Sequence, residues 1–146
     1  MSTRTASAAK ATAVNYLKQL RVGLWAVSST FSIPAGQSIS AGDVIQMIAV
    51  PDGAQVVSLI VKSDYFQAAI EVGDGLDDNR YVDLVSTSAA FAVAYGAGGV
   101  GANPVAPYTY STDDTIDILV SLVSVSSVLG AFYMTAILTM DPTQQN

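Results

Sequence analysis

From Gly23 onward, apolar and polar residues alternate in short runs that Gly, Pro, Asp and Ser interrupt every 8 to 12 residues or so. Side chains of a β-strand point alternately to two faces, so this period predicts strands, and no helix-length pattern follows. Eight strands are expected. They cover residues 24–33, 44–50, 54–62, 66–72, 81–85, 89–95, 115–123 and 131–140.

Turn residues separate these strands. Pro51-Asp52-Gly53 is the clearest turn, because proline pre-sets the backbone of the second turn position and glycine accepts a positive φ. Eight short strands in one chain favour an all-β fold, a jelly-roll-like β-sandwich whose two sheets each bury one face. A closed barrel is the alternative.

Strict alternation assigns faces within the strand 54–62. It places Val57, Leu59 and Val61 together on a fully apolar face, with Val56 and Ile60 on the opposite, mixed face. Some outward positions are therefore apolar, and we expect neighbouring subunits to cover them. The outward apolar positions are Val56, Ile60, Leu119 and Val123.

The first 22 residues have a different texture from the rest. They are rich in Ala, Ser and Thr, and Val14, Leu17 and Leu20 recur at three-residue steps. This pattern favours either a short helix over Ala8–Leu20 or a segment that becomes ordered on binding. We expect an N-terminal arm at residues 1–22 and one β-sandwich domain at residues 23–146.

Charge divides the chain at the same place. The arm holds four of the six basic residues and no acid, whereas all 12 acids follow it, and the net charge is −6. An acidic body disfavours a nucleic-acid partner for the protein. For the arm alone, the alternatives are contact with nucleic acid or an acidic protein surface, and a partly ordered solubilising tail. The candidates for capsid or subunit contact are Arg4, Lys10, Lys18, Arg21 and Trp25.

Composition points to assembly. Hydrophobic residues make up 51% of the chain and charged residues only 12%, against about 25% charged in typical soluble domains. A surface so poor in charge exposes apolar patches, and such patches usually mark contacts with other subunits. The sequence therefore predicts an oligomer or a component of a larger assembly.

One uncharged stretch is long enough to cross a membrane as a helix. It runs from Ile118 to Met140, but serines and Gly130 dilute it, β-branched residues dominate its first half, and no Lys or Arg flanks it. Two buried strands joined by a Ser-rich turn are the preferred interpretation. Because Lys10 and Lys18 interrupt the N-terminal segment, no secretory signal and no membrane partner are expected.

The absence of Cys and His removes most catalytic chemistry. Without them there is no disulfide, no thiol nucleophile, none of the usual zinc ligands and none of the side chain that most commonly acts as an acid or base at physiological pH. Among Asp113, Asp114 and Asp117, no pair fits a catalytic motif, and Asp117 is predicted to be an outward residue of a strand. We expect neither an enzyme nor a cofactor.

A second acidic cluster lies in the segment 73–79. Asp74, Asp77 and Asp78 are weak calcium candidates, since calcium prefers loops of oxygen ligands. Their spacing does not match the alternating ligands of an EF-hand loop. The alternative is a solvated turn in which Asp side chains cap backbone amides. A calcium- or carbohydrate-binding module thus stays open as a competing function.

The segment Val50–Val57 resembles a pattern found in small structural proteins of tailed bacteriophages. In that pattern a Pro-x-Gly-Ala turn enters an apolar strand and is followed by Val-Gly-Asp, Tyr-Val-Asp and Asp-Thr-Ile segments, here at Val72, Tyr81 and Asp114. The resemblance covers about Ile33 to Met140, and its motifs are turn and strand features of low specificity.

The resemblance implies a capsid decoration or cement protein. Such a subunit is a jelly roll without catalytic residues that commonly forms a homotrimer, contacts the major capsid protein and stabilises the head. It would be made in the bacterial host cytoplasm and reside on the capsid surface of the virion. A head fibre, a head-tail connector or a tail protein of the same kind of particle is the alternative.

Overall fold

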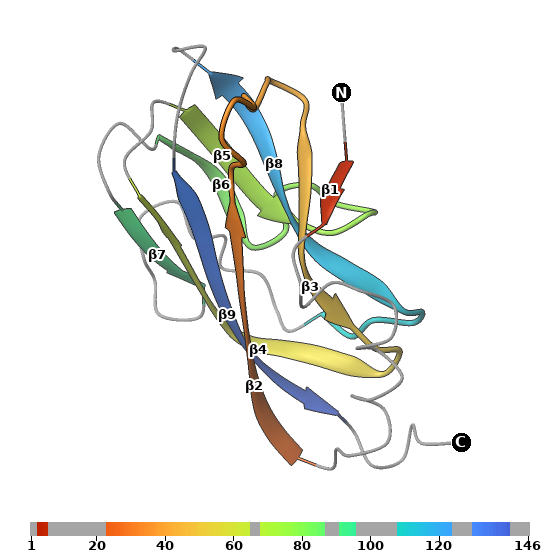
Figure 1. The fold of residues 1–146 in the computed structure, drawn as a ribbon. Coiled ribbons are helices and arrows are strands. Elements are labelled where there is room, and N and C mark those ends of the chain that lie inside the picture. The colour runs from red at the N-terminus through yellow and green to blue at the C-terminus, as the bar shows by residue number, and fades with distance from the viewer. Residues whose placement is uncertain are drawn as a thin grey trace.

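The computed structural model describes residues 3–5, 23–64, 68–86, 91–95, 108–123 and 130–140, and all of their regular structure is β-strand. Nine strands form two sheets packed face to face (Figure 1). The strands are β1 (Thr3–Thr5), β2 (Gly23–Ser32), β3 (Val44–Val50), β4 (Ala54–Ser63), β5 (Ala68–Gly73), β6 (Val82–Ser86), β7 (Phe91–Tyr95), β8 (Asp114–Val123) and β9 (Ala131–Met140).

The order of the strands is that of a jelly roll. One sheet runs β1-β3-β8-β5-β6 and the other β2-β9-β4-β7, so successive strands from β2 onward alternate between sheets except at the β5–β6 hairpin. The chain wraps around its own core in this way in jelly rolls. The predicted all-β jelly-roll sandwich is confirmed, and the closed-barrel alternative is wrong because the two sheets stay separate.

The eight expected strands all form, with ends that shift by at most about two residues, which is within the usual scatter of strand boundaries. The sequence pattern missed only β1, which pairs parallel with β3 and lies inside the expected arm. The remainder of that arm, with its expected helix over Ala8–Leu20, lies outside the described residues. The division into an arm and a body therefore stays a prediction.

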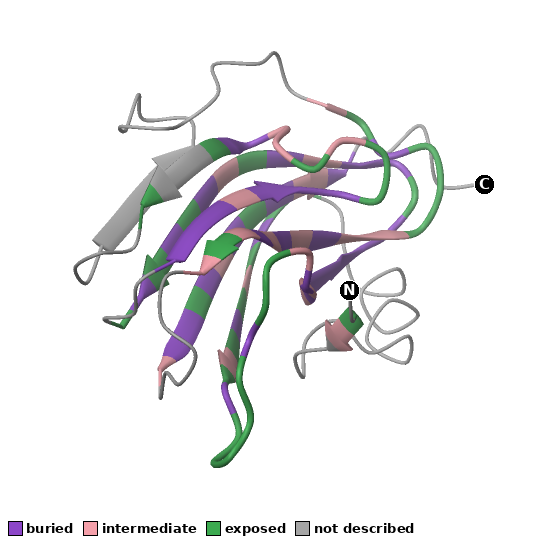
Figure 2. Cartoon of the chain, turned by 90° about the horizontal axis from the view of Figure 1, so that it is seen from above, coloured by how far each residue is buried: buried purple, intermediate pink, exposed green. Residues whose placement is uncertain are grey.

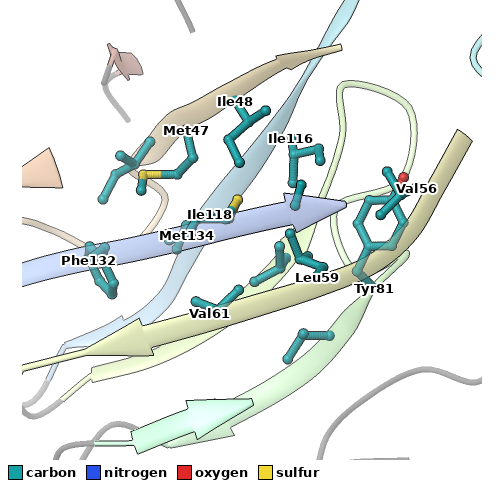
Figure 3. Close-up of a cluster of buried hydrophobic side chains, with 14 of the residues drawn as sticks. Met47, Ile48, Val56, Leu59, Val61, Tyr81, Ile116, Ile118, Phe132 and Met134 are labelled. Atoms are coloured by element: carbon teal, nitrogen blue, oxygen red, sulfur yellow. The ribbon is translucent and has the colours of Figure 1, made fainter. Parts of the chain in front are cut away.

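The core fills the space between the sheets (Figure 3). Met47 and Ile48 of β3 and Ile118 of β8 face Leu59 of β4 and Phe132 of β9, and all five are fully buried. Along much of β2, β4, β8 and β9, buried residues alternate with exposed or half-buried ones, visible as coloured bands in Figure 2. Burial of these inner faces is the main favourable term in folding.

The expected face assignment in β4 is partly wrong, because a β-bulge interrupts the alternation. The register to β9 shifts between Val56 and Ser58, which leaves Val57 as the extra residue. Val56 is buried in the core at 1% exposure, and Val57 is exposed at 45%. Leu59 and Val61 are inward and Ile60 outward, as alternation predicts.

The uncharged stretch from Ile118 to Met140 forms strands. Its first part lies in β8 and its last part is β9, and these two strands belong to different sheets. Ile118 and Val120 in β8 and Phe132 in β9 face the core and are fully buried. Among the described residues, no helix is long and apolar enough to span a membrane.

Candidate interaction surfaces

The acidic loop after β5 is organised around Asp74, whose side chain is fully buried. Its carboxylate accepts hydrogen bonds from the backbone N–H groups of Leu76 and Asp77, both at 3.0 Å, and from the Arg80 guanidinium. Gly73 is tightly enclosed here, since a Cβ on it would overlap the Asp77 carbonyl oxygen. The loop is therefore a turn held together by its own hydrogen bonds, in which an Asp side chain caps backbone amides, as the alternative to a calcium site predicts.

Arg80 links this loop to Tyr108. Its guanidinium carbon lies 3.6 Å from the centroid of the Tyr108 ring, a cation–π contact. Burial disfavours the charge of Arg80, but the hydrogen bond and charge of Asp74 outweigh it and raise the pKa. Beside them, the hydroxyls of Tyr81 and Tyr110 are 2.8 Å apart in the core, and burial raises the pKa of Tyr110.

This arrangement bears on the three calcium candidates. The cation next to Asp74 is Arg80, which donates to Oδ2, and Oδ1 accepts from the two backbone amides, so both oxygens of this carboxylate are already engaged. Asp77 is half-exposed 3.9 Å from Arg80, and Asp78 is exposed. In the part of the chain that the structure covers, no group of three or more ligands is placed to hold a metal ion.

The other acidic cluster lies at the start of β8. Asp113 accepts a hydrogen bond from the backbone N–H of Asp52 at 3.0 Å, and Asp114 accepts one from its neighbour Thr115 at 2.8 Å. Asp117 faces outward, as expected, opposite Gln46 of β3. These carboxylates support turns and strand ends.

Asp117 has an unusual environment for an outward residue. Burial raises the pKa of Asp117 to about 7, a hydrogen bond with Thr115 opposes this rise, and the charges of Asp114, Asp74 and Asp78 add to it. Its Oδ1 atom is buried and has no hydrogen-bond partner among the described residues. No sequence pattern predicts this shift, because it depends on what packs around the strand.

Arg4 is the one basic arm residue whose position is described. It lies in β1, where its guanidinium donates to Gln37 Oε1 at 3.1 Å and to the Ser38 carbonyl at 2.8 Å. It also lies 3.5 Å from a carboxylate oxygen of the buried Asp43. Arg4 therefore contacts the body of its own chain, with a fifth of its side chain exposed.

The remaining contact candidates separate into two groups. Trp25 is 7% exposed and belongs to the hydrophobic core cluster, which accounts for it as a packing residue of β2. Lys10, Lys18 and Arg21 lie outside the described residues, and their part in subunit contact stays a prediction.

The outward side of the four-stranded sheet carries a surface that the sequence predicted only in part. We call the outward side chains of β2, β9 and β4 the neutral face, because Lys62 is the one charged residue in these three strands. Large apolar side chains are exposed on it. They are Leu24 at 70%, Val57 at 45%, Ile60 at 46%, Tyr133 at 37% and Ile137 at 37%.

On the arrangement of its strands, the chain belongs to the class of jelly-roll β-sandwiches. Chains in phage capsid structures share this fold. One, in the capsid of Ralstonia phage GP4, is 13% identical with a TM-score of 0.64, over 81% of this chain and 84% of that chain.

A chain in the capsid asymmetric unit of cyanophage Pam1 is 18% identical with a TM-score of 0.61, over 82% of this chain and 87% of that one. A chain in the acidic stable capsid of Helicobacter pylori bacteriophage KHP30 is 12% identical with a TM-score of 0.56, over 82% and 89%. No protein-family model and no curated protein matches the sequence. At these identities the similarity establishes a shared fold.

Proposed function

We propose that this chain is a structural protein of a bacteriophage virion, with no catalytic role, that decorates and reinforces the capsid surface. The observation that carries the proposal is the jelly roll shared with chains of three phage capsids over about four fifths of the sequence. Fold alone does not define function, so the surfaces must agree with it.

The surfaces support a role in assembly. The acidic clusters are engaged in turns and an ion pair, whereas the neutral face exposes apolar side chains that a solitary protein would have reason to bury. The lack of Cys and His also leaves few carriers for catalysis. We therefore propose partners that are proteins: further copies of this chain, with a trimer favoured, and the major capsid protein.

The test uses heads of the parent phage prepared without this chain. Purified full-length protein is added, unbound material is removed, and the particles are imaged by electron cryomicroscopy. The expected result is density at regular positions on the outer shell, in fixed stoichiometry, with heads that break at a higher temperature. Density at the connector, a fibre or the tail would relocate the protein, and no bound density anywhere would overturn the proposal.

A further inference from the structure

The neutral face is a continuous surface by register. Ser28, Thr135 and Ile60 lie side by side across β2, β9 and β4, and the next outward row contains Ile137. Ile60 and Ile137 are thus diagonal neighbours on one face, within reach of a common partner. Leu76 and Leu122 are also exposed, but they lie in the acidic loop and in the other sheet, away from this surface.

Charge is distributed so that this face differs from the rest of the body. None of the 12 acids lies in β2, β4, β7 or β9, whereas Glu71, Asp83, Asp114 and Asp117 are in the five-stranded sheet and most others are in loops. At the end of the face, Lys62 lies 5.7 Å from the centroid of the Tyr133 ring, and the Tyr133 hydroxyl donates to Asp64 at 3.1 Å. Asp64, directly after β4, offsets the charge of Lys62 at this end of the face.

We infer that the neutral face is the surface through which copies of this chain associate. Each copy carries a net charge of −6, so two copies repel each other over their acidic parts. Contact between the neutral faces of two copies avoids this repulsion, and it also removes apolar side chains from water. A strongly basic or acidic partner would instead be recognised by opposite charges, which this face lacks.

The edge of the same sheet is consistent with such a contact. β2 pairs with β9 along all ten of its residues without a bulge, and among the described residues it pairs on that side alone. It contains no charged residue and no proline, the usual devices that protect an edge strand from pairing with other chains. An edge of this kind is tolerable in a protein whose neighbours cover it.

The inference rests on the proposed function and deepens it by naming the surface for self-association. The experiment compares purified full-length Ile60→Asp with Leu122→Asp, since both replace an exposed apolar strand residue by the same charge on opposite sheets. Sedimentation velocity over a concentration series measures the association constant. We expect Ile60→Asp to weaken association roughly tenfold or more, and Leu122→Asp to change it less than about twofold.

Two further variants separate the causes. Ile60→Lys should weaken association as Ile60→Asp does, because both variants lose the apolar contact. If Ile60→Lys associates normally, charge repulsion alone explains the effect of Asp, and apolar contact at Ile60 is overturned as the cause of association. Ile60→Thr keeps a β-branched side chain and should weaken association about threefold even if the charged variants do not fold by circular dichroism.

Outcomes for the inference and for the function can be told apart by also measuring binding to the prepared heads. A wild-type chain that is monomeric at every concentration but binds heads would overturn the inference and leave the function standing. The same holds if Ile60→Asp self-associates normally but no longer binds heads. Normal self-association of Ile60→Asp together with normal head binding would overturn the inference alone, and an assembled wild-type chain that never binds heads would overturn the function alone.

Discussion

The two sheets of the sandwich share one core but present different outer surfaces. The four-stranded sheet contains a single charged residue, Lys62, and exposes Ile60 and Ile137 to solvent. The five-stranded sheet contains four acids on its strands and borders the acidic loop around Asp74. Most of the exposed large apolar residues lie in the four-stranded sheet, with Leu76 and Leu122 as the exceptions, whereas no strand of that sheet contains an acid.

This difference shows where each side draws its stability. On the side of the five-stranded sheet, two buried carboxylates are paired within the chain, Asp74 with Arg80 in the acidic loop and Asp43 with Arg4 just before β3. On the neutral face, the exposed apolar groups are not buried within the chain. They contribute favourable free energy only when another surface removes them from water. The acidic side is thus stabilised by contacts within the chain, whereas the neutral face is suited to contact with a partner.

The largest effect is expected from breaking the ion pair on the acidic side. Arg80→Met leaves the buried Asp74 carboxylate without its cation, which should lower the free energy of unfolding by about 3 kcal/mol. Urea unfolding measures this. Asp78→Ala, at an exposed position in the same loop, is the control and should change it by less than about 0.5 kcal/mol. Equal decreases in the free energy of unfolding for both variants would contradict a stabilising role for the ion pair between Asp74 and Arg80.

The next effect concerns the boundary between core and neutral face in β4. Val56→Ala removes two buried methyl groups and should cost about 2 kcal/mol, whereas Val57→Ala at the bulge should cost less than about 0.5 kcal/mol in the dissociated chain. Thermal and urea unfolding at low concentration give the comparison. The reverse ranking would restore the strict alternation and remove Val57 from the neutral face.

A pH-dependent effect is expected at Asp117. Burial raises its pKa in the folded chain to about 7 from an ordinary value near 3.8, so the folded state binds the proton more tightly than the unfolded state. Asp117 therefore causes the stability of the fold to fall as the pH rises from about 4 to about 7, and the penalty stays constant above that range.

Asp117→Asn should remove this penalty. After discounting for partial exposure, we expect it to raise the free energy of unfolding by about 1–2 kcal/mol at pH 8 and to change it little at pH 4. Urea unfolding across pH values measures the difference, with the exposed Asp83→Asn as control. A gain that is independent of pH would show that ionisation of Asp117 is not its cause.

The smallest effect is expected from calcium. Because Arg80 already neutralises Asp74, adding millimolar calcium or a chelator should leave the melting temperature unchanged within about 1 °C. Differential scanning fluorimetry is sufficient. A rise that disappears in Asp77→Asn would contradict this expectation and restore the calcium-binding module as a candidate function.

Local pattern predicted the fold well because turn residues and alternation act over a few neighbours. Pro51-Asp52-Gly53 forms the expected turn with Gly53 at φ 81°, and the eight strands follow from the same kind of signal. Sequence pattern did not predict the bulge at Val57 or the strand β1, because these features depend on pairing with strands distant in sequence, β9 and β3 respectively. Register is a property of two strands, and one strand's sequence does not contain it.

The site was predicted less completely for a related reason. Low charge correctly indicated exposed apolar positions, and Ile60 is one of them, but the pattern could not tell that Leu24, Tyr133 and Ile137 join it on one sheet. The pairing of Arg80 with Asp74 and Tyr108 and the pKa of Asp117 arise from three-dimensional packing. The roles of Lys10, Lys18 and Arg21 stay predictions.

The place of β9 between β2 and β4 has a consequence for synthesis of the protein. Of the four strands in this sheet, β9 is the one made after the others, and until it emerges β2 has no partner among the described strands and the sheet cannot form. In a polypeptide that stops before Ala131, the apolar inner sides of β2 and β4 stay uncovered, which favours aggregation. The four-stranded sheet can therefore form only after β9 has been made.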